Sequence, residues 1–345
     1  MVDSLSSMQD SNKPDGLTKS IGASNPLYSD GMMSRKYVLV VGSPRSGTSW
    51  LQVLLAQHPK VATTQETHLF NGYLGHLGRA WERYKSLGQD IGMTRLLSDD
   101  DFYGLCAAFA EMVLKKIADI HPGATVVLEK TPDHVCHAPF ILRLLPEACF
   151  VHIIRDPRSV VSSVAVAARS WASHWASRNV VHNALRWRSD VALGRQIGVL
   201  TRRYYEVRYE DLLSDGGKTL ENIFAWLELP QDLEFCRAAL DACCMDRMQQ
   251  GGKHIRGYEM LRRTQPGFLR KGRPDGWNEE LSSTAIATVE YVAGDLMQKC
   301  GYSLSTMKIG SKAKLRVRIH SVLDSIEPRI RRTIDIAFRK AHSLA

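Results

Sequence analysis

Short continuous runs of apolar residues recur along the chain and predict buried strands at 37–42, 125–128, 149–154 and 204–209. Runs without polar alternation are typical of strands covered on both faces of a parallel sheet. Longer segments with helical spacing of apolar residues separate them, at 102–119, 138–145, 158–168, 178–198 and 218–227. This alternation predicts an α/β fold, a single three-layer domain around a central, mostly parallel sheet.

The same pattern divides the chain into three parts. Residues 1–36 are rich in Ser, Asp, Gly and Asn without periodicity, so we expect a flexible leader ahead of a domain over 37–305. Residues 306–345 form a basic tail, in which apolar residues recur at helical spacing from Pro328 and alternate with arginines. Such a helix can lie on anionic lipid, at the inner face of a membrane, or dock on its own domain or on a second subunit.

Composition and charge narrow the class of protein. The 345 residues are 44% hydrophobic and 23% charged, as in ordinary globular proteins. The tail has ten Lys and Arg against three Asp and Glu and so carries +7 of the net charge of +9; no nucleic-acid partner is expected for the nearly neutral domain. We expect a cytoplasmic protein for three reasons. The seven cysteines have no CxxC spacing, the N-terminus is polar, and no apolar run approaches the roughly 18 residues of a membrane span.

A candidate phosphate-binding loop follows the first predicted strand. Its sequence, residues 42–49, reads GSPRSGTS, and it leads into a helix whose N-terminal N–H groups attract anions. The spacing is that of a Walker loop, but Thr48 stands where a nucleoside triphosphatase has its lysine, and the cation is Arg45 instead. Such a loop suits a 5′-phosphate carrying a mobile group of low charge, with Trp50 against a purine. The alternative is a plain helix N-cap.

The stretch PRSGTSW closely resembles the 5′-phosphosulfate loop of sulfotransferases that use 3′-phosphoadenosine 5′-phosphosulfate (PAPS). The resemblance implies a P-loop-like fold, PAPS as co-substrate, and donor binding by Arg45, Ser46, Gly47, Thr48, Ser49 and Trp50. The segment VHIIRDPRSVVSS is similar to the family's 3′-phosphate motif, which implies the same role for Arg155 and Ser163. Arg158 and Ser162 are near alternatives, and a structural ion pair is the other interpretation of the Arg-Asp step.

Two later segments continue the resemblance. Residues 268–277 are similar to the family's RKG loop, which implies that Arg270, Lys271 and Gly272 close over the 3′-phosphate as a mobile lid. The family's Gly-Asp pair is reversed here, at 275–276, and no role is carried over to it. The segment EVRYEDLL also recurs in these enzymes; Tyr209 either approaches the nucleotide or packs in the core.

Sulfuryl transfer needs a base for the acceptor and cations for the transferred group. The three oxygens of that group share one negative charge, so side-chain cations can stabilise an in-line transition state, and no metal is expected. The segment TQETHLF resembles that of carbohydrate and tyrosyl-protein sulfotransferases, which implies Glu66 as the base, partly buried. His68 is the alternative base, followed by His134 and His137. Lys130 of LEKTP resembles a lysine that reaches the sulfonate in heparan-type enzymes; a strand-end lysine in water is the alternative.

The acceptor is poorly specified by the sequence. Trp171 and Trp175, one helical turn apart, and Trp187 either stack on an acceptor or belong to the core. The candidate acceptors are a small molecule, a carbohydrate, a lipid or a peptide that bears a hydroxyl or an amine. Two other functions are considered: a P-loop kinase or nucleoside triphosphatase, which the missing Walker lysine disfavours, and a nucleotide-binding membrane adaptor without catalysis.

Overall fold

The computed structural model describes residues 35–87, 92–252, 255–258, 267–270, 272–305, 309–312, 314–315 and 317–319. Lys271, residues 1–34 of the predicted leader and the predicted tail helix from Pro328 lie outside these residues. The first strand begins at Lys36, one residue before the predicted start of the domain. No helix in the described part of the chain combines the length and the apolar character needed to cross a bilayer.

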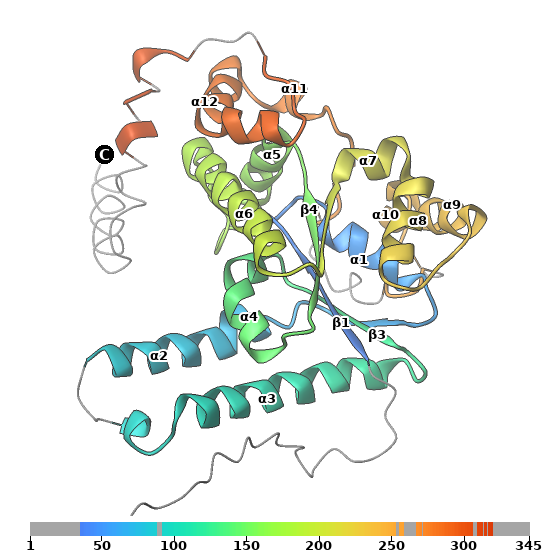
Figure 1. The fold of residues 1–345 in the computed structure, drawn as a ribbon. Coiled ribbons are helices and arrows are strands. Elements are labelled where there is room, and N and C mark those ends of the chain that lie inside the picture. The colour runs from blue at the N-terminus through green and yellow to red at the C-terminus, as the bar shows by residue number, and fades with distance from the viewer. Residues whose placement is uncertain are drawn as a thin grey trace, which may run out of the picture. The chain divides into compact units, whose positions relative to one another are not determined.

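Five parallel strands form the centre of the domain (Figure 1). They are β1 (Lys36–Val41), β2 (Val61–Thr63), β3 (Val126–Lys130), β4 (Cys149–Ile154) and β5 (Tyr204–Arg208). Their order is β2-β3-β1-β4-β5, so β1 lies in the middle, where Val38 is in register with Leu128 and Cys149. The predicted α/β class and its parallel sheet are confirmed. Sequence reasoning missed β2, since its three residues are too short a run to stand out.

Helices cover both faces of the sheet. Those that the sequence predicts are α1 (Thr48–Ala56), α3 (Asp99–Ile120), α4 (Ala138–Leu144), α5 (Pro157–Ala167), α6 (Val180–Leu200) and α8 (Gly216–Trp226). The others are α2 (Gly75–Ser86), α7 (Tyr209–Ser214), α9 (Leu233–Ala242), α10 (Met245–Gln249), α11 (Trp277–Glu280) and α12 (Ser283–Lys299). Three short helical segments also occur among the described residues: η1 (Leu69–Leu74), η2 (Gly92–Arg95) and η3 (Pro132–His137).

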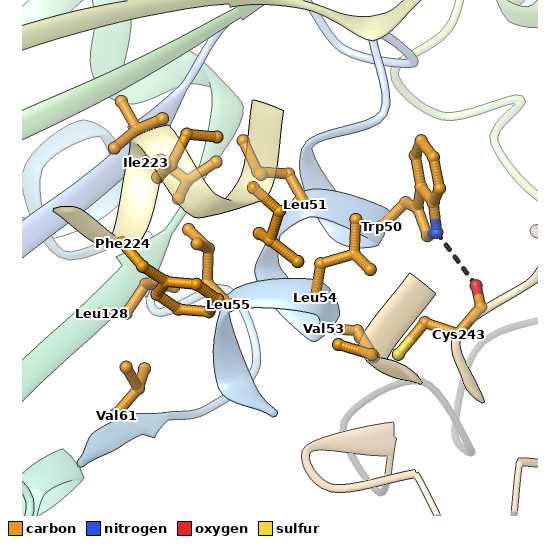
Figure 2. Packing of buried hydrophobic residues seen from close by; sticks show 14 of the residues in the cluster. Trp50, Leu51, Val53, Leu54, Leu55, Val61, Leu128, Ile223, Phe224 and Cys243 are labelled. Carbon is orange, nitrogen blue, oxygen red and sulfur yellow. Dashed lines mark hydrogen bonds between the residues drawn. The ribbon is translucent and has the colours of Figure 1, made fainter. Parts of the chain in front are cut away.

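One face of the sheet packs against α1 and the α7–α10 group. Leu51, Leu54 and Leu55 of α1 are fully buried and lie among side chains of β3 and α8, including Ile223 and Phe224 (Figure 2). Burying a leucine of this kind stabilises the fold by about 1.5–3 kcal/mol. The helix that follows the first loop is therefore held firmly against the sheet.

The opposite face packs against α3 and α4, and a further cluster joins α5, α6 and α12. Trp187 of α6 is fully buried in that cluster and donates a hydrogen bond from Nε1 to the carbonyl of Arg155 (2.9 Å). Because all strands are parallel, their carboxyl ends lie at one edge of the sheet, where a ligand site of an open α/β sheet is expected. The candidate loops after β1, β3, β4 and β5 meet there.

Candidate active site

The loop after β1 is shaped by two glycines. Gly42 and Gly47 have positive φ values of 150° and 98°. A Cβ on Gly47 would lie 2.5 Å from the ring of Tyr209, and one on Gly42 would lie 2.4 Å from the carbonyl oxygen of Ile153. Only glycine therefore lets the loop lie this close to its neighbours. No side chain caps α1, which leaves its first N–H groups facing the loop.

A cavity of about 420 Å³ opens above this loop, within the size range of ligand sites. Most of the residues that the sequence assigned to the site line it: Arg45, Gly47, Thr48, Ser49, Trp50, Glu66, His68, Arg155, Ser163, Tyr209, Arg270 and Gly272. Ser46 belongs to the same loop but is fully buried and outside the lining, and its hydroxyl has no hydrogen-bond partner within the described chain. Segments far apart in the sequence are thus brought into one site.

Three guanidinium groups gather at the cavity, those of Arg45, Arg155 and Arg270. Arg45 donates from Nε to the Ser163 hydroxyl (3.0 Å) and from Nη2 to the carbonyl of Phe268 (2.7 Å). Burial, and then the charges of Arg270 and Arg155, lower the pKa of Arg45 to about 10. Arginines that disfavour one another's charge form a site with affinity for anions.

Arg155 occupies the end of β4. Its guanidinium lies 4.2 Å from the centre of the Tyr209 ring and donates from Nη2 to the carbonyl of Arg273 (2.9 Å). Its Nε–H is buried, with no partner among the described residues. An unused buried donor points to an absent acceptor, because such groups are costly to leave unpaired.

The near alternatives to Arg155 and Ser163 have other partners. Arg158 is buried and paired with Asp156 (2.6 Å) and Glu290 (2.8 Å), so it holds α5 against α12. Ser162 lines the cavity but donates to Glu280, whose carboxylate is also 2.5 Å from Arg270.

The carboxylate of Glu66 also lines the cavity, where its charge acts on Arg45. The buried Nζ of Lys130 donates to Glu66 Oε1, and His68 Nε2 lies 3.6 Å from Glu66 Oε2. The Glu66 side chain is 32% exposed against 4% for Lys130, so one carboxylate oxygen is fixed by the lysine while the group stays open to the cavity. This is the partial burial expected of a base.

Beneath this pair, Glu129 forms a buried anchor that sequence reasoning missed. Its Oε1 accepts from the Thr67 N–H (3.2 Å), the Thr67 hydroxyl (2.8 Å) and the Thr131 hydroxyl (2.7 Å). Its Oε2 lies 2.9 Å from Nδ1 of His134. Burial raises the pKa of Glu129, but the contact with His134 and the hydrogen bonds from Thr131 and Thr67 outweigh it and lower the pKa to about 2. An ionised carboxylate thus fixes the residues next to Glu66 and Lys130.

The two histidines placed last among the candidate bases lie elsewhere. His134 is fully buried against Glu129, and its Nε2 accepts from the Phe70 N–H (3.2 Å). Burial, and then the neighbouring His134, lower the pKa of His137 to about 4. Neither side chain belongs to the described lining of the cavity.

Aromatic and charged side chains line a further part of the cavity, where the Trp171 ring lies 5.5 Å from the guanidinium of Arg45. Trp171 and Trp175 lie with ring centres 5.9 Å apart, whereas Trp187 belongs to the core. Asp133 and Arg186 also line this wall and are paired at 2.5 Å. The wall offers ring faces together with hydrogen-bonding groups to a second ligand.

Comparison with known proteins decides the family. The model of the sulfotransferase family matches residues 38–233, more than half of the chain. The chain belongs to the sulfotransferase family. The sulfotransferase domain of the olefin synthase from Synechococcus PCC 7002 superposes with a TM-score of 0.52 at 19% identity, covering 81% of this chain and 99% of that domain. This likeness confirms the fold.

Two curated relatives of this sulfotransferase are similar over parts of the chain. Protein-tyrosine sulfotransferase 2 from Gallus gallus is 28% identical over 130 residues, which is 37% of this chain and 33% of the relative. Nodulation protein NoeE from Sinorhizobium fredii is 22% identical over 297 residues, or 77% of this chain and 66% of the relative. Among the protein-tyrosine relatives the match spans as little as 24% of the relative's length.

The third predicted motif lies beyond the range that the family model matches. Its described residues nevertheless line the cavity, and side chains of the motifs in the matched range hold its backbone. Tyr209 donates to the carbonyl of Gly272 (3.0 Å), and Ser159 donates to that of Pro274 (2.8 Å). Sequence reasoning assigned no role to Phe268, although its carbonyl and ring both contact Arg45.

Proposed function

We propose that this chain transfers the sulfuryl group of PAPS to a hydroxyl or amine by in-line displacement, with Glu66 as the general base. One observation carries the proposal. One cavity is lined both by a cluster of guanidinium groups and by Glu66, whose carboxylate is paired with the buried Lys130. The first suits a nucleotide donor with two phosphate positions, and the second suits activation of an acceptor.

The residues present fit the donor. The unpartnered hydroxyl of Ser46 and the unpartnered Nε–H of Arg155 are two buried groups that an anion would satisfy. Residues 44–49 with the start of α1 would hold the phosphosulfate, and Arg155, Ser163, Arg270 and Gly272 would hold the 3′-phosphate. Lys271, assigned to the same role, lies outside the described residues. Trp50 and Tyr209, with ring centres 5.3 Å apart, form an aromatic wall for the purine.

When bound, the donor supplies a sulfuryl group on a phosphate leaving group. Glu66 accepts the proton of the acceptor, with His68 3.6 Å away as the alternative base. Lys130 holds one oxygen of Glu66, and its charge stabilises negative charge that develops beside it. Arg45 provides a second fixed cation at the loop.

For the acceptor, the wall formed by Trp171 and Trp175 supports a molecule with a ring or apolar face. A carbohydrate, a lipid or another small molecule meets that requirement. The similar protein from Gallus gallus is described as a protein-tyrosine sulfotransferase, which adds a phenolic hydroxyl to the acceptors worth testing.

Calorimetric binding tests the proposal. Wild-type protein should bind 3′-phosphoadenosine 5′-phosphate (PAP) without metal and more tightly than ATP with Mg²⁺. Arg155→Ala removes charge-assisted hydrogen bonds worth about 3 kcal/mol in all, so its Kd for PAP should rise about 100-fold. Arg188→Ala, which removes a surface arginine paired with Asp295, is the matched control and should bind PAP as the wild type does. Preference for ATP with Mg²⁺ would support a kinase instead, and unchanged PAP affinity in Arg155→Ala would overturn the 3′-phosphate site.

A further inference from the structure

An exposed apolar stripe follows the helical segment formed by η1 and α2. It consists of Tyr73, Leu77, Ala80, Tyr84 and Leu87, at the spacing that places residues on one helix face. We call this set the α2 stripe. Met93 and Leu96 extend the apolar surface past the end of the helix. Apart from Ala80, the exposed fractions of these side chains run from 48% for Tyr84 to 82% for Leu96. Exposed apolar residues in such a row, rather than singly, mark an interaction surface.

The α2 stripe cannot turn inward, because the other side of the helix is anchored. Trp81 stacks on Phe102 of α3 with ring centres 4.2 Å apart, and its Nε1 donates to Asp99 (2.8 Å). Gly78 lies so close to Phe140 that a Cβ would be 2.8 Å from the ring. The helix is thus fixed with its apolar stripe facing solvent.

Cationic side chains run beside the stripe. Arg79 and Arg83, four residues apart, are both exposed, and Arg79 also donates to Nδ1 of the exposed His76 (3.0 Å). Arg95 lies exposed next to Leu96. A helix with an apolar face beside basic residues is the pattern of segments that lie in the interface of an anionic membrane.

The stripe begins next to the active site. His68 lines the cavity, and η1 starts at the following residue, so Tyr73 is little more than one helical turn from it. In Figure 1, α2 runs out past α4 at the edge of the domain. A flat surface that contacts the α2 stripe would therefore lie near the part of the cavity that His68 and Glu66 line.

We infer that the α2 stripe docks on a lipid bilayer that contains anionic headgroups. Charge selects this occupant. The basic tail of this chain carries +7 and does not complement a face lined by Arg79 and Arg83, and the nearly neutral domain of a second copy has no net charge to attract it. A helix face that stands out from the domain also matches a flat surface. If the chain has the function proposed above, docking of this surface identifies the acceptor class as molecules presented at a membrane surface. This step rests on the proposed function.

Vesicle sedimentation with the full chain tests the inference. The probe is phosphatidylcholine vesicles with and without phosphatidylglycerol. The double variant Leu77→Ser, Tyr84→Ser should lose at least about tenfold in partitioning to the anionic vesicles, because each side chain contributes apolar burial in the interface. The tail is present in every sample, so its contribution cancels.

The matched control is Leu105→Ser, Phe109→Ser on α3. These side chains are 63% and 42% exposed at helical spacing, but they lie in a helix rich in acidic residues, among them Glu111 and Asp119. This control should bind vesicles as the wild type does. The inference would be overturned if the Leu77→Ser, Tyr84→Ser variant bound the anionic vesicles as strongly as the wild type does. It would also be overturned if this variant kept vesicle binding but lost self-association or the binding of an acidic protein. PAP affinity is measured on the same samples. An unchanged affinity shows that the variants are folded and that the donor site is intact, whatever the result for vesicle binding.

Discussion

The buried carboxylate of Glu129 makes stability depend on pH in a predictable direction. Its pKa is about 2 in the folded protein, against 4.5 for an ordinary glutamate. A group whose pKa is lowered by folding stabilises the protein fully above the unfolded pKa and loses that effect as the pH falls through the folded pKa. The contribution of Glu129 should therefore disappear between about pH 4.5 and pH 2. A tenfold change in proton affinity is worth about 1.4 kcal/mol, so the whole contribution is about 3 kcal/mol.

Glu129→Gln keeps the shape of the side chain and removes its charge. We expect urea unfolding at pH 7 to give a free energy of unfolding about 3 kcal/mol below that of the wild type. At pH 3.5, where the wild type has already lost part of the contribution, the difference should be smaller by about 1 kcal/mol. Glu82→Gln is the control: it makes the same change in an exposed carboxylate that accepts from the Tyr103 hydroxyl, and we expect a loss below about 1 kcal/mol at both pH values.

The variant should also affect the reaction. Glu129 binds both groups of Thr67, the residue after Glu66, and it precedes Lys130 in β3. Loosening that anchor should lower turnover of a radiolabelled donor while leaving the Kd for PAP unchanged. The reasoning would be refuted by a stability difference that is the same at pH 7 and pH 3.5.

Three further predictions concern the cavity. Glu66→Gln should lower turnover by about 10²–10⁴-fold with PAP affinity unchanged, and turnover like that of the wild type would remove Glu66 from the base position. Ser163→Ala should weaken PAP binding about tenfold by calorimetry, whereas Ser162→Ala, whose hydroxyl donates to Glu280, should change it less than about twofold; equal effects would contradict the assignment. Gly47→Ala forces a Cβ to 2.5 Å from the Tyr209 ring at a positive φ, so its free energy of unfolding should fall by about 1–3 kcal/mol in urea, and an unchanged midpoint would argue against the loop packing.

The elements that sequence reasoning found share one property, a strong local pattern. The strand expected at 149–154 is β4 as observed, because every residue in it is buried and a short, unbroken apolar run is typical of a strand covered on both faces. The helix α2 was missed because its apolar residues do not mark a buried face. Only Gly75, Gly78 and Trp81 are buried in it, while the larger apolar residues of the α2 stripe face solvent. The spacing of apolar residues shows which face of a helix is apolar, and in α2 that apolar face is exposed while a different face packs against the domain.

The site shows a similar division. Arg45, Glu66 and Arg155 were found because each lies in a local motif that resembles one of the sulfotransferase family, and the structure brings all three to one cavity. Arg45 and Arg155 follow predicted strands, which end at one edge of the sheet, whereas Glu66 follows β2, which sequence reasoning missed. The contacts that organise them could not be placed. Glu129 accepts from Thr67 across 62 residues of sequence, and Asp133 meets Arg186 across 53. Nothing in a local window signals such pairs, although a glutamate inside an apolar strand is itself a sign of a buried partner.

The bonds made by the arginines set a limit on how strongly the donor can bind. Arg45 and Arg155 donate to the carbonyls of Phe268 and Arg273 in the late loop. An incoming anion must take these N–H groups from the carbonyls, so each new bond replaces one that already exists. Bonds to a charged oxygen are about twice as strong as bonds to a neutral one, which makes the exchange favourable but smaller than the sum of the new contacts. The Ser46 hydroxyl and the Arg155 Nε–H are different, because neither has a hydrogen-bond partner among the described residues that an anion would have to displace. They should therefore contribute more to the affinity, per bond formed, than the more obvious cations around them.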